Sequence, residues 1–493
     1  VTEPLAGVFR GGLRCDPLTL SMYASDGTRY EIQPLAVAFP KDRSDVVTLA
    51  RYSGETNIPL VPRGSGSGVA GGAIGAGVIV DFSRAMRRIE EIGESTVRVQ
   101  PGVVLERLNS VLREYGRYFP PDPSNIDVTT IGGMLAVDAA GSHSIRIGSM
   151  RDHVQSIEMV LGGGSTVEFS VEPLTQLATP PPRRPDDPLS SPGTPTGEHV
   201  SPAETKRTIV SKLAKLLADH EELIQEKQPR LIRNCSGYYL RGILSEDELH
   251  VPRMLVGSEG TLGMFTAATL HTSPLPAHRG VVLLLFGQLE AAVQTVRTIA
   301  AEQPSACDLL DRRLLTLARE ADPRFGDLVS PAAEAALIVE QTGLSEREVR
   351  DRIANVISAV RNVNLRAVVA REAYSDEDVE FLWSLPHRVV PHLIRLKGRS
   401  RPLPFVEDVA VPPESLNEFL IRAQRVFQNH EVTASLYSHA AAGQVHLRPF
   451  LPPPRPEEGS RIEAIARDLY EAVFAVGGTI SGEHGDGLAR TAF

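Results

Sequence analysis

The stretch Pro62-Arg-Gly-Ser-Gly-Ser-Gly-Val-Ala-Gly-Gly72 has glycine or serine at most of its positions and separates two predicted strands, Ile58–Val61 and Val78–Val80. Glycines allow backbone N–H groups to converge on an anion at distances that a Cβ atom would block. The spacing matches neither the phosphate-binding loop nor the dinucleotide-binding fingerprint. Taken alone, the stretch fits an anion-binding loop or a flexible hairpin.

Two further stretches are also built from small residues. Residues 120–148 have few long charged side chains, which suits a backbone that lines a flat ring or a diphosphate. A helix N-terminus packed on a sheet would explain only Thr130 and Gly132. A third glycine-rich stretch, Gly257–Gly263, precedes the predicted strand Met264–Leu270. The small residues between 120 and 148 form four groups: Pro120-Pro-Asp-Pro-Ser124, Thr129-Thr-Ile-Gly-Gly133, Ala139-Ala-Gly141 and Gly148.

Composition and charge exclude several classes of protein. The chain has 493 residues, of which 42% are hydrophobic and 23% are charged, as in ordinary globular proteins. This excludes a disordered tail, a collagen and a disulfide-stapled mini-domain, and the length predicts two or three domains. The net charge of −10 argues against a nucleic-acid-binding protein.

Cysteine usage indicates a reducing compartment, and hydropathy argues against a membrane span. The three cysteines, Cys15, Cys235 and Cys307, form neither a metal-binding spacing nor a disulfide framework. No apolar run reaches the 18 or more residues of a membrane span, and no signal pattern follows Val1. We therefore expect a cytoplasmic protein without a transmembrane segment, and we expect that both ends of the sequence are cut.

The pattern of elements predicts two α+β parts, residues 1–275 and 276–493. Residues 173–204 are rich in Pro, Ser, Thr and Asp and predict a surface loop or a disordered insertion. Helices are predicted in the second part near residues 289–302, 345–361, 414–428 and 459–475. Strands are predicted there at Val281–Phe286, Ala336–Glu340, Leu365–Ala370, Phe405–Val411 and Thr433–Ser438.

Histidines and a glutamate near the end of the chain are candidate metal ligands. His446 shares one face of a predicted strand with Gln444 and Arg448, and His439 lies at the mouth of the turn before it. Glu483 and His484 follow in a glycine-rich turn. Two imidazoles and a carboxylate with an open position suit Zn²⁺ or Mn²⁺. The alternative is two hydrogen-bonded histidines and a turn glutamate.

Three motifs of the second part complete a family pattern: Glu407-Asp-Val-Ala-Val-Pro412, Ser438-His-Ala-Ala-Ala-Gly-Gln-Val-His446 and Ser481-Gly-Glu-His-Gly-Asp-Gly487. With the three earlier stretches, they resemble the FAD-dependent D-2-hydroxyacid dehydrogenase branch of the vanillyl-alcohol oxidase superfamily. The resemblance runs from about Leu35 to the end. It implies an FAD-binding domain of that type over residues 1–275 and an α+β, ferredoxin-like cap domain over 276–493, truncated at its end.

The resemblance also implies cofactor contacts. The loop from Arg63 to Gly72 would hold the FAD pyrophosphate, and Ser67 stands where relatives with covalent flavin have histidine, so the FAD is expected to be non-covalent. The implied cofactor-binding residues are Arg63, Gly64, Ser65, Gly66, Ser67, Gly68, Gly71, Gly72, Pro121, Asp122, Ser124, Thr130, Gly132, Gly133, Gly141, Gly148, Glu259 and Gly260.

The resemblance assigns the remaining residues to the chemistry. His439, His446 and Glu483 would bind a divalent metal, Zn or Mn, and His484 would be the catalytic base. A metal lowers the pKa of the substrate hydroxyl while the Cα hydride leaves for the flavin. Relatives have an arginine at the place of Pro386, so Arg388 becomes the candidate that binds the substrate. This departure leaves the identity of the substrate open.

The expected activity is oxidation of a lactate-like D-2-hydroxy acid to the 2-oxo acid. The chain most resembles members fused to a C-terminal iron–sulfur region, so we expect electrons to pass to an iron–sulfur cluster on a missing segment or partner, which could place the protein at the periphery of the inner membrane. The alternatives are an oxidase of the same fold acting on a sugar lactone or alcohol, a non-catalytic flavin electron-transfer subunit, and a metal hydrolase.

Overall fold

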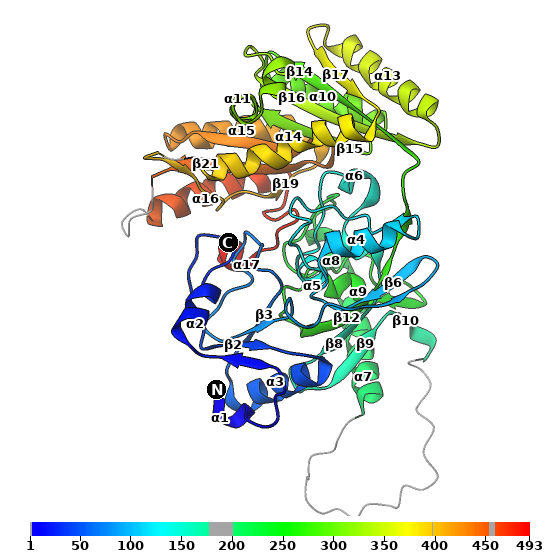
Figure 1. The fold of residues 1–493 in the computed structure, drawn as a ribbon, viewed down its shortest axis with the longest axis vertical. Coiled ribbons are helices and arrows are strands. Elements are labelled where there is room, and N and C mark those ends of the chain that lie inside the picture. The colour runs from blue at the N-terminus through cyan, green and yellow to red at the C-terminus, as the bar shows by residue number, and fades with distance from the viewer. Residues whose placement is uncertain (1, 177–200, 397, 453–458) are drawn as a thin grey trace, which may run out of the picture.

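The computed structural model describes residues 2–176, 201–396, 398–452 and 459–493. Two parts stack on each other, with the N-terminal part below and a large sheet flanked by helices above (Figure 1). This arrangement confirms the prediction of an α+β protein. Most of the predicted insertion at 173–204 lies outside the described residues, between β10 (Val171–Pro173) and α7 (Pro202–Asp219).

The lower part contains two main sheets. The first has the order β1-β2-β4-β3, in which β2, β4 and β3 are parallel neighbours, and α3 (Arg43–Thr56) connects β2 to β3. The second is antiparallel, with the order β5-β6-β12-β8-β9. The strands are β1 (Gly12–Arg14), β2 (Ala36–Phe39), β3 (Leu60–Arg63), β4 (Val78–Asp81), β5 (Ile89–Ile92), β6 (Thr96–Val99), β8 (Val154–Val160), β9 (Thr166–Phe169) and β12 (Met264–His271).

Segments between these strands form the top of the lower part. The glycine-rich stretch begins at the end of β3, so the first sheet fixes the position of its first residues. Two helices here are short because a residue with positive φ follows each of them: α5 (Ile131–Val137) ends at Asp138 (φ +56°), and α6 (Ser144–Ile147) ends at Gly148 (φ +77°). Further helices are α4 (Leu105–Arg113), α8 (Glu221–Lys227) and α9 (Val251–Leu255).

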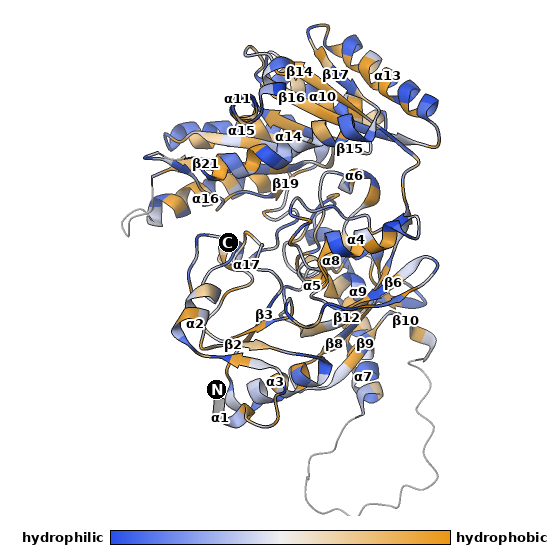
Figure 2. Ribbon diagram, in the orientation of Figure 1, coloured by the Kyte–Doolittle hydropathy of each residue, from blue (hydrophilic) through white to orange (hydrophobic). Residues whose placement is uncertain are grey.

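The upper part is one sheet with the order β17-β14-β16-β15-β20-β21-β18, and β19 also pairs with β21. Alternate residues of β14 enter two different cores, which explains its continuous apolar run (Figure 2). The strands are β14 (His278–Phe286), β15 (Ala306–Asp311), β16 (Ala335–Gly343), β17 (Val368–Ala373), β18 (Arg401–Pro402), β19 (Val409–Ala410), β20 (Ala434–His439) and β21 (Gln444–Leu451).

Helices cover both faces of the upper sheet. One core packs α10 (Leu289–Ala301), α13 (Glu346–Val363), α15 (Leu416–Asn429) and α16 (Gly459–Phe474), close to the four predicted helices. The other core packs α11 (Arg312–Ala321) and α14 (Asp376–Ile394). None of the helices within the described ranges combines the length and apolarity needed to cross a bilayer.

The predicted strand Phe405–Val411 is wrong over most of its length, since only Val409–Ala410 pairs with β21. Asp408 has a φ of +76°, which an extended strand does not allow. The predicted strand Leu365–Ala370 begins three residues later, at Val368.

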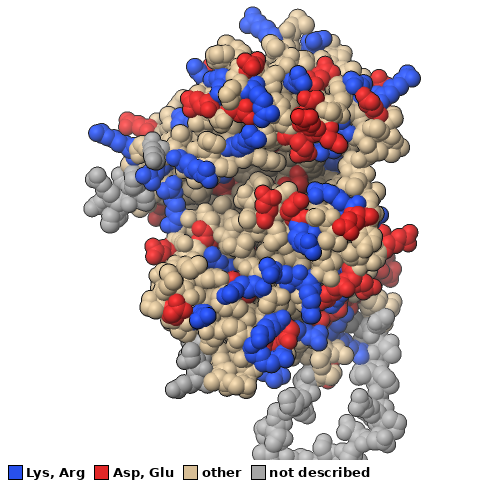
Figure 3. All heavy atoms as spheres, in the orientation of Figure 1, with Lys and Arg blue, Asp and Glu red and all other residues tan. Residues whose placement is uncertain are grey.

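On the face shown in Figure 3, acidic and basic side chains are mixed, with no continuous basic field.

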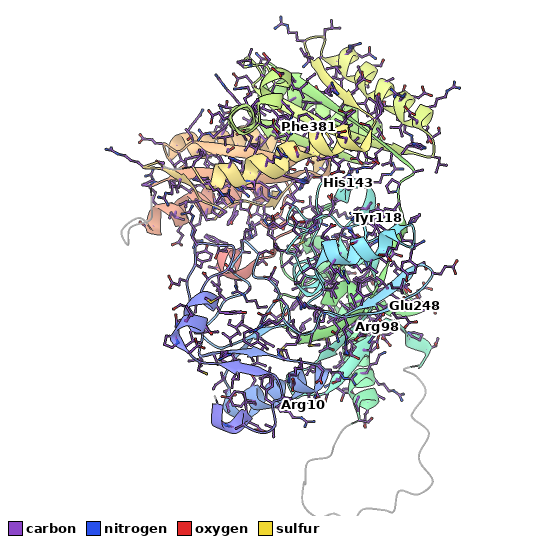
Figure 4. The ribbon with its side chains drawn as sticks, in the orientation of Figure 1. Arg10, Arg98, Tyr118, His143, Glu248 and Phe381 are labelled. Atoms are coloured by element: carbon purple, nitrogen blue, oxygen red, sulfur yellow. The ribbon has the colours of Figure 1, made fainter. Side chains whose placement is uncertain are left out.

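A buried ionic network joins the two parts. The carboxylate of Glu340 on β16 accepts hydrogen bonds from Trp383 Nε1 (2.6 Å) and Arg279 (3.0 Å), and lies 3.1 Å from His143 Nε2. His143, labelled in Figure 4 where the parts meet, bonds through Nδ1 to Asp122 at 2.6 Å. Burial would raise the pKa of Glu340, but His143 and Arg279 outweigh burial and hold that pKa well below its usual range.

We expect Glu340→Gln to lower the free energy of unfolding by about 3 kcal/mol, because it leaves the half-buried cations His143 and Arg279 without their buried partner. Glu380→Gln is the control, since exposed Glu380 also pairs with Arg279 and should cost at most about 1 kcal/mol. Urea unfolding, followed by fluorescence of the single tryptophan, Trp383, measures both. Equal losses in the two variants would contradict the prediction.

The cost of Glu340→Gln should depend on pH. Folding depresses the pKa of Glu340, so its contribution is complete above about pH 4.5 and declines below that value. Burial would lower the pKa of His143, but Asp122 and Glu340 raise it, so its contribution is complete below about pH 6.5 and is lost as the pH rises through the raised pKa. The difference from the native protein should therefore be largest between these two pH values.

Candidate active site

A cavity lies between the two parts, with small residues on its lower side and histidines on its upper side. The lower lining comes from the glycine-rich stretch after β3, residues 122–142 around α5, and the turn before β12. The upper lining comes from β20, β21, α14 and the C-terminal motif 481–487. Of the predicted cofactor-binding residues, the cavity is lined by Arg63, Gly64, Ser65, Gly66, Ser67, Gly68, Gly72, Asp122, Ser124, Thr130, Gly132, Gly133, Gly141, Glu259 and Gly260.

The lower lining depends on glycine at specific places. A Cβ on Gly64 would lie 2.1 Å from Thr130 Oγ1, and a Cβ on Gly141 would lie 2.0 Å from the Asp122 carbonyl oxygen. At Gly68, by contrast, a Cβ would meet nothing within 4 Å. Close packing thus joins the stretches around residues 64, 130 and 141 into one wall that exposes backbone to the cavity.

Three predicted cofactor-binding residues, Gly71, Pro121 and Gly148, do not line the cavity. Gly71 has a φ of +81° and Gly148 a φ of +77°, so the backbone conformation itself favours glycine at both positions. A Cβ on Gly148 would also lie 2.3 Å from the Asp152 carboxylate. Direct contact with a cofactor at these three residues stays a prediction.

The predicted metal ligands meet at the upper side of the cavity. The Oε1 atom of Glu483 lies 3.7 Å from His439 Nε2 and 3.4 Å from His446 Nε2. Ligand atoms of a tetrahedral zinc site lie about 3.3 Å apart, given bonds of about 2.0–2.1 Å. Glu483 Oε2 is buried without a hydrogen-bond partner, as an atom that faces a missing ligand would be. The donor set therefore fits a divalent cation.

His484 lies beside this group. Its Nε2 is 3.5 Å from Glu483 Oε1, and its Nδ1 is 2.5 Å from Glu407 Oε1. Burial lowers the pKa of His484, but the carboxylates of Glu407 and Asp408 outweigh burial and raise it to about 9. The imidazole can therefore hold a proton on the nitrogen that faces the cavity.

Carboxylates behind the histidines set the orientation of the rings. His439 Nδ1 is 3.0 Å from Asp308 Oδ1, which leaves His439 Nε2 facing Glu483. Asp308 also accepts hydrogen bonds from Ser142, in the lower part, and from Tyr437. Sequence reasoning missed Asp308 and Tyr437, because nothing in the residues around an aspartate in an apolar strand indicates that it will bond to a distant histidine.

Asp408 holds the C-terminal motif in place. Its Oδ1 accepts the backbone N–H of Glu483 (3.0 Å) and the Gln444 side-chain amide (3.0 Å), and its Oδ2 accepts the N–H of His484 (2.8 Å). Its carbonyl accepts the N–H of Gly482. Because Gln444 lies on β21, these bonds fix Glu483 and His484 next to His446.

Contacts within 4 Å link the imidazoles to four carboxylates and two guanidinium groups of the described residues. The cluster therefore has more negative than positive charge when its histidines are neutral. Protons on the imidazoles or a divalent cation on deprotonated ligands can supply the missing positive charge. The carboxylates are Asp308, Glu407, Asp408 and Glu483, and the guanidinium groups belong to Arg448 and Arg490.

Arg388, the predicted substrate-binding residue, is not among the residues that line the cavity. Its guanidinium pairs with Asp322 at 3.0 Å, and half of its side chain is exposed. The helix α14 presents Pro386, His387 and Val390 to the cavity instead. The role of Arg388 in substrate binding stays a prediction without geometric support.

Comparison with protein families places this geometry in a known class. Residues 34–170 match the family of FAD binding domains, and residues 275–493 match the C-terminal domain of FAD linked oxidases. The fold is shared with alkyldihydroxyacetonephosphate synthase (TM-score 0.64, 16% identity, covering 95% of this chain and 78% of that one). It is also shared with 4-ethylphenol oxidase from Gulosibacter chungangensis (TM-score 0.63, 15% identity, covering 96% and 86%).

Curated relatives narrow the class. The chain is 31% identical to D-2-hydroxyglutarate dehydrogenase of Pantoea ananatis, over 96% of this chain and 46% of the relative. It is 27% identical to glycolate oxidase subunit GlcD of Bacillus subtilis, over 96% and 85%. The chain combines an FAD binding domain with a C-terminal domain of FAD linked oxidases, and its relatives agree with the FAD-linked D-2-hydroxyacid dehydrogenase family that its motifs predicted. It spans about half the length of the D-2-hydroxyglutarate dehydrogenases that it matches.

We expect Asp408→Asn to weaken Zn²⁺ or Mn²⁺ binding by about 10- to 100-fold while FAD stays bound, because the amide is neutral and replaces one accepting oxygen by a donor, which weakens the hydrogen bonds that fix the motif. Asp486→Asn is the matched control: Asp486 belongs to the same motif but accepts hydrogen bonds from Ser236 and Gly237 instead. Isothermal titration calorimetry measures the affinity, and flavin absorbance measures FAD. Equal affinity in the two variants would contradict the prediction.

Proposed function

We propose that this protein binds FAD non-covalently and oxidises a D-2-hydroxy acid to the 2-oxo acid. One observation carries the proposal: the histidine and carboxylate cluster of the upper part faces, across one cavity, the small-residue wall of the lower part. Side chains suited to remove a proton and a wall suited to a flavin thus line the same cavity. The names of the relatives, D-2-hydroxyglutarate dehydrogenase and D-lactate dehydrogenase, support the choice of substrate class.

The two parts would divide the work. Residues 1–275 would form the FAD-binding domain, with the backbone of residues 63–68 around the pyrophosphate and residues 130–141 along the ring system. Bound FAD would accept the hydride from the substrate Cα. Ser67 lines the cavity and offers no imidazole to a covalent bond, which supports non-covalent binding. Residues 276–493 would form the cap domain.

The upper cluster would handle the proton. His439, His446 and Glu483 would hold Zn²⁺ or Mn²⁺, and the cation would lower the pKa of the substrate hydroxyl and of the nearby imidazole. His484 would take the hydroxyl proton at Nε2, since Nδ1 is occupied by Glu407. Glu407 would stabilise the resulting imidazolium, and the cavity walls would exclude water.

We further propose that electrons leave to an iron–sulfur centre on a partner or on a segment outside these 493 residues. Cys15 is exposed, whereas Cys235 and Cys307 are buried, and none of them belongs to a group of candidate metal ligands among the described residues. An iron–sulfur cluster takes four thiolates, so these three cysteines do not support such a cluster within the described residues.

Acid precipitation of one sample should release the flavin into the supernatant. In an anaerobic screen of D- and L-2-hydroxy acids on a second sample, a D-acid should bleach the flavin. We expect His484→Ala to slow the bleaching by about 10²- to 10⁴-fold with FAD still bound. His430→Ala is the control, since His430 pairs with Asp468 outside the cavity. A yellow protein bleached by no hydroxy acid would favour the electron-transfer subunit, and a colourless one the hydrolase.

Reoxidation of the flavin tests the acceptor. If the electrons are meant for an iron–sulfur centre, air should reoxidise the substrate-reduced flavin more slowly than the substrate reduces it, whereas an artificial dye should reoxidise it quickly. Stopped-flow absorbance measures both rates on the same preparation. Reoxidation by air at the rate of reduction would identify an oxidase.

A further inference from the structure

Arg448 carries a positive charge at the wall of the cavity and has no role in the proposed transfer of the proton and the hydride. It lies on β21, two residues after His446, so both side chains leave the same face of the sheet. Its side chain is only 13% exposed, and it lines the cavity together with Tyr437 and His446. A cation in this position is costly to bury without a partner.

The guanidinium of Arg448 has donors to spare. Its Nε and Nη1 groups are buried and have no hydrogen-bond partner, while its Nη2 lies 3.7 Å from Glu407 Oε2, too far for a hydrogen bond. Glu407 is already held by His484 and by Arg490. At 3.7 Å, Arg448 does not satisfy Oε2 of Glu407, which also lacks a hydrogen-bond partner. The Nε and Nη1 groups of Arg448 are thus left without an acceptor from the described residues, as they would be if the acceptor were an anion that is not part of the protein.

No other guanidinium or ammonium group among the described cavity-lining residues is available for that anion. Among the residues that line the cavity there are two arginines and no lysine, and the second arginine, Arg63, donates to the carbonyl oxygens of Ser25 and Ala73. On α14, proline occupies position 386, and Arg388 pairs with Asp322 outside the cavity. Within the described residues, Arg448 is the cavity-lining guanidinium with buried N–H groups that lack a hydrogen-bond partner.

We propose that Arg448 binds a carboxylate of the substrate. The proposal rests on the proposed function, which makes the substrate a hydroxy acid. A guanidinium presents a planar set of donors that matches a carboxylate in two parallel hydrogen bonds. Placed next to His446, it would hold the acid while the hydroxyl carbon lies at the histidine cluster. The recognition of the acid would thus come from a strand of the cap sheet and not from α14.

The test measures binding without turnover. The 2-oxo acids pyruvate and 2-oxoglutarate perturb flavin absorbance when they bind beside it, and titration gives their dissociation constants. We expect Arg448→Met to raise these constants by about 100-fold and Arg448→Lys by about 10-fold, because lysine keeps the charge and loses the paired geometry. Arg388→Met is the matched control and should bind like the native protein.

The two ligands separate the two carboxylates that a dicarboxylic substrate offers. Losses with both pyruvate and 2-oxoglutarate would place the carboxylate next to the reacting carbon on Arg448, and a loss with 2-oxoglutarate alone would place the distal one there. Unchanged constants in folded Arg448→Lys and Arg448→Met, or the loss appearing in Arg388→Met instead, would overturn the proposal.

A neutral substrate analogue separates this inference from the proposed function. The carboxamide of the reactive hydroxy acid should reduce the flavin of the native protein and of Arg448→Met at similar rates, since it lacks the charge that Arg448 binds. An equal loss with the carboxamide would overturn the role of Arg448. Failure of every hydroxy acid to reduce the native flavin would overturn the proposed function, while the titrations would still report on Arg448.

Discussion

Two adjacent buried carboxylates, Glu407 and Asp408, hold together the side of the cavity that carries the histidines. Both are fully buried, and burial of a charge is costly unless it is paired and hydrogen-bonded. Asp408 collects backbone N–H groups of the motif 481–487, while Glu407 collects His484 and Arg490. The motif has little apolar surface of its own, so these ionic bonds and not core packing keep it against β21.

The same motif couples the two parts of the chain. Glu259, from the turn before β12, accepts the N–H groups of Asp486 and Gly487, and the N–H of Ala489 bonds to the carbonyl of Ala70. The C-terminal α17 (Gly487–Arg490) therefore rests on the glycine-rich stretch of the lower part (Figure 1). One segment thus touches the small-residue wall at one end and the histidine cluster at the other.

A second link between the parts runs through side chains of the upper sheet. Ser142, next to the cavity wall, donates to Asp308, which also orients His439. A shift of Ser142 would also displace His439, because the buried carboxylate of Asp308 bonds to both side chains. Together with the Glu340 network, this link ties the two walls of the cavity to each other.

Local sequence determined the elements and the inventory of the site. Apolar periodicity located the strands of the upper sheet and the helices on it, and small-residue motifs identified most of the cavity wall, because these properties depend on neighbours a few residues away. Long-range contacts decided the rest. The positive φ of Asp408 broke a predicted strand, and Asp308 became the partner of His439 across 131 residues. Arg388 pairs with Asp322, while buried N–H groups of Arg448 lack a hydrogen-bond partner. Such pairings depend on which segments folding brings together, and spacing along the chain carries no record of them.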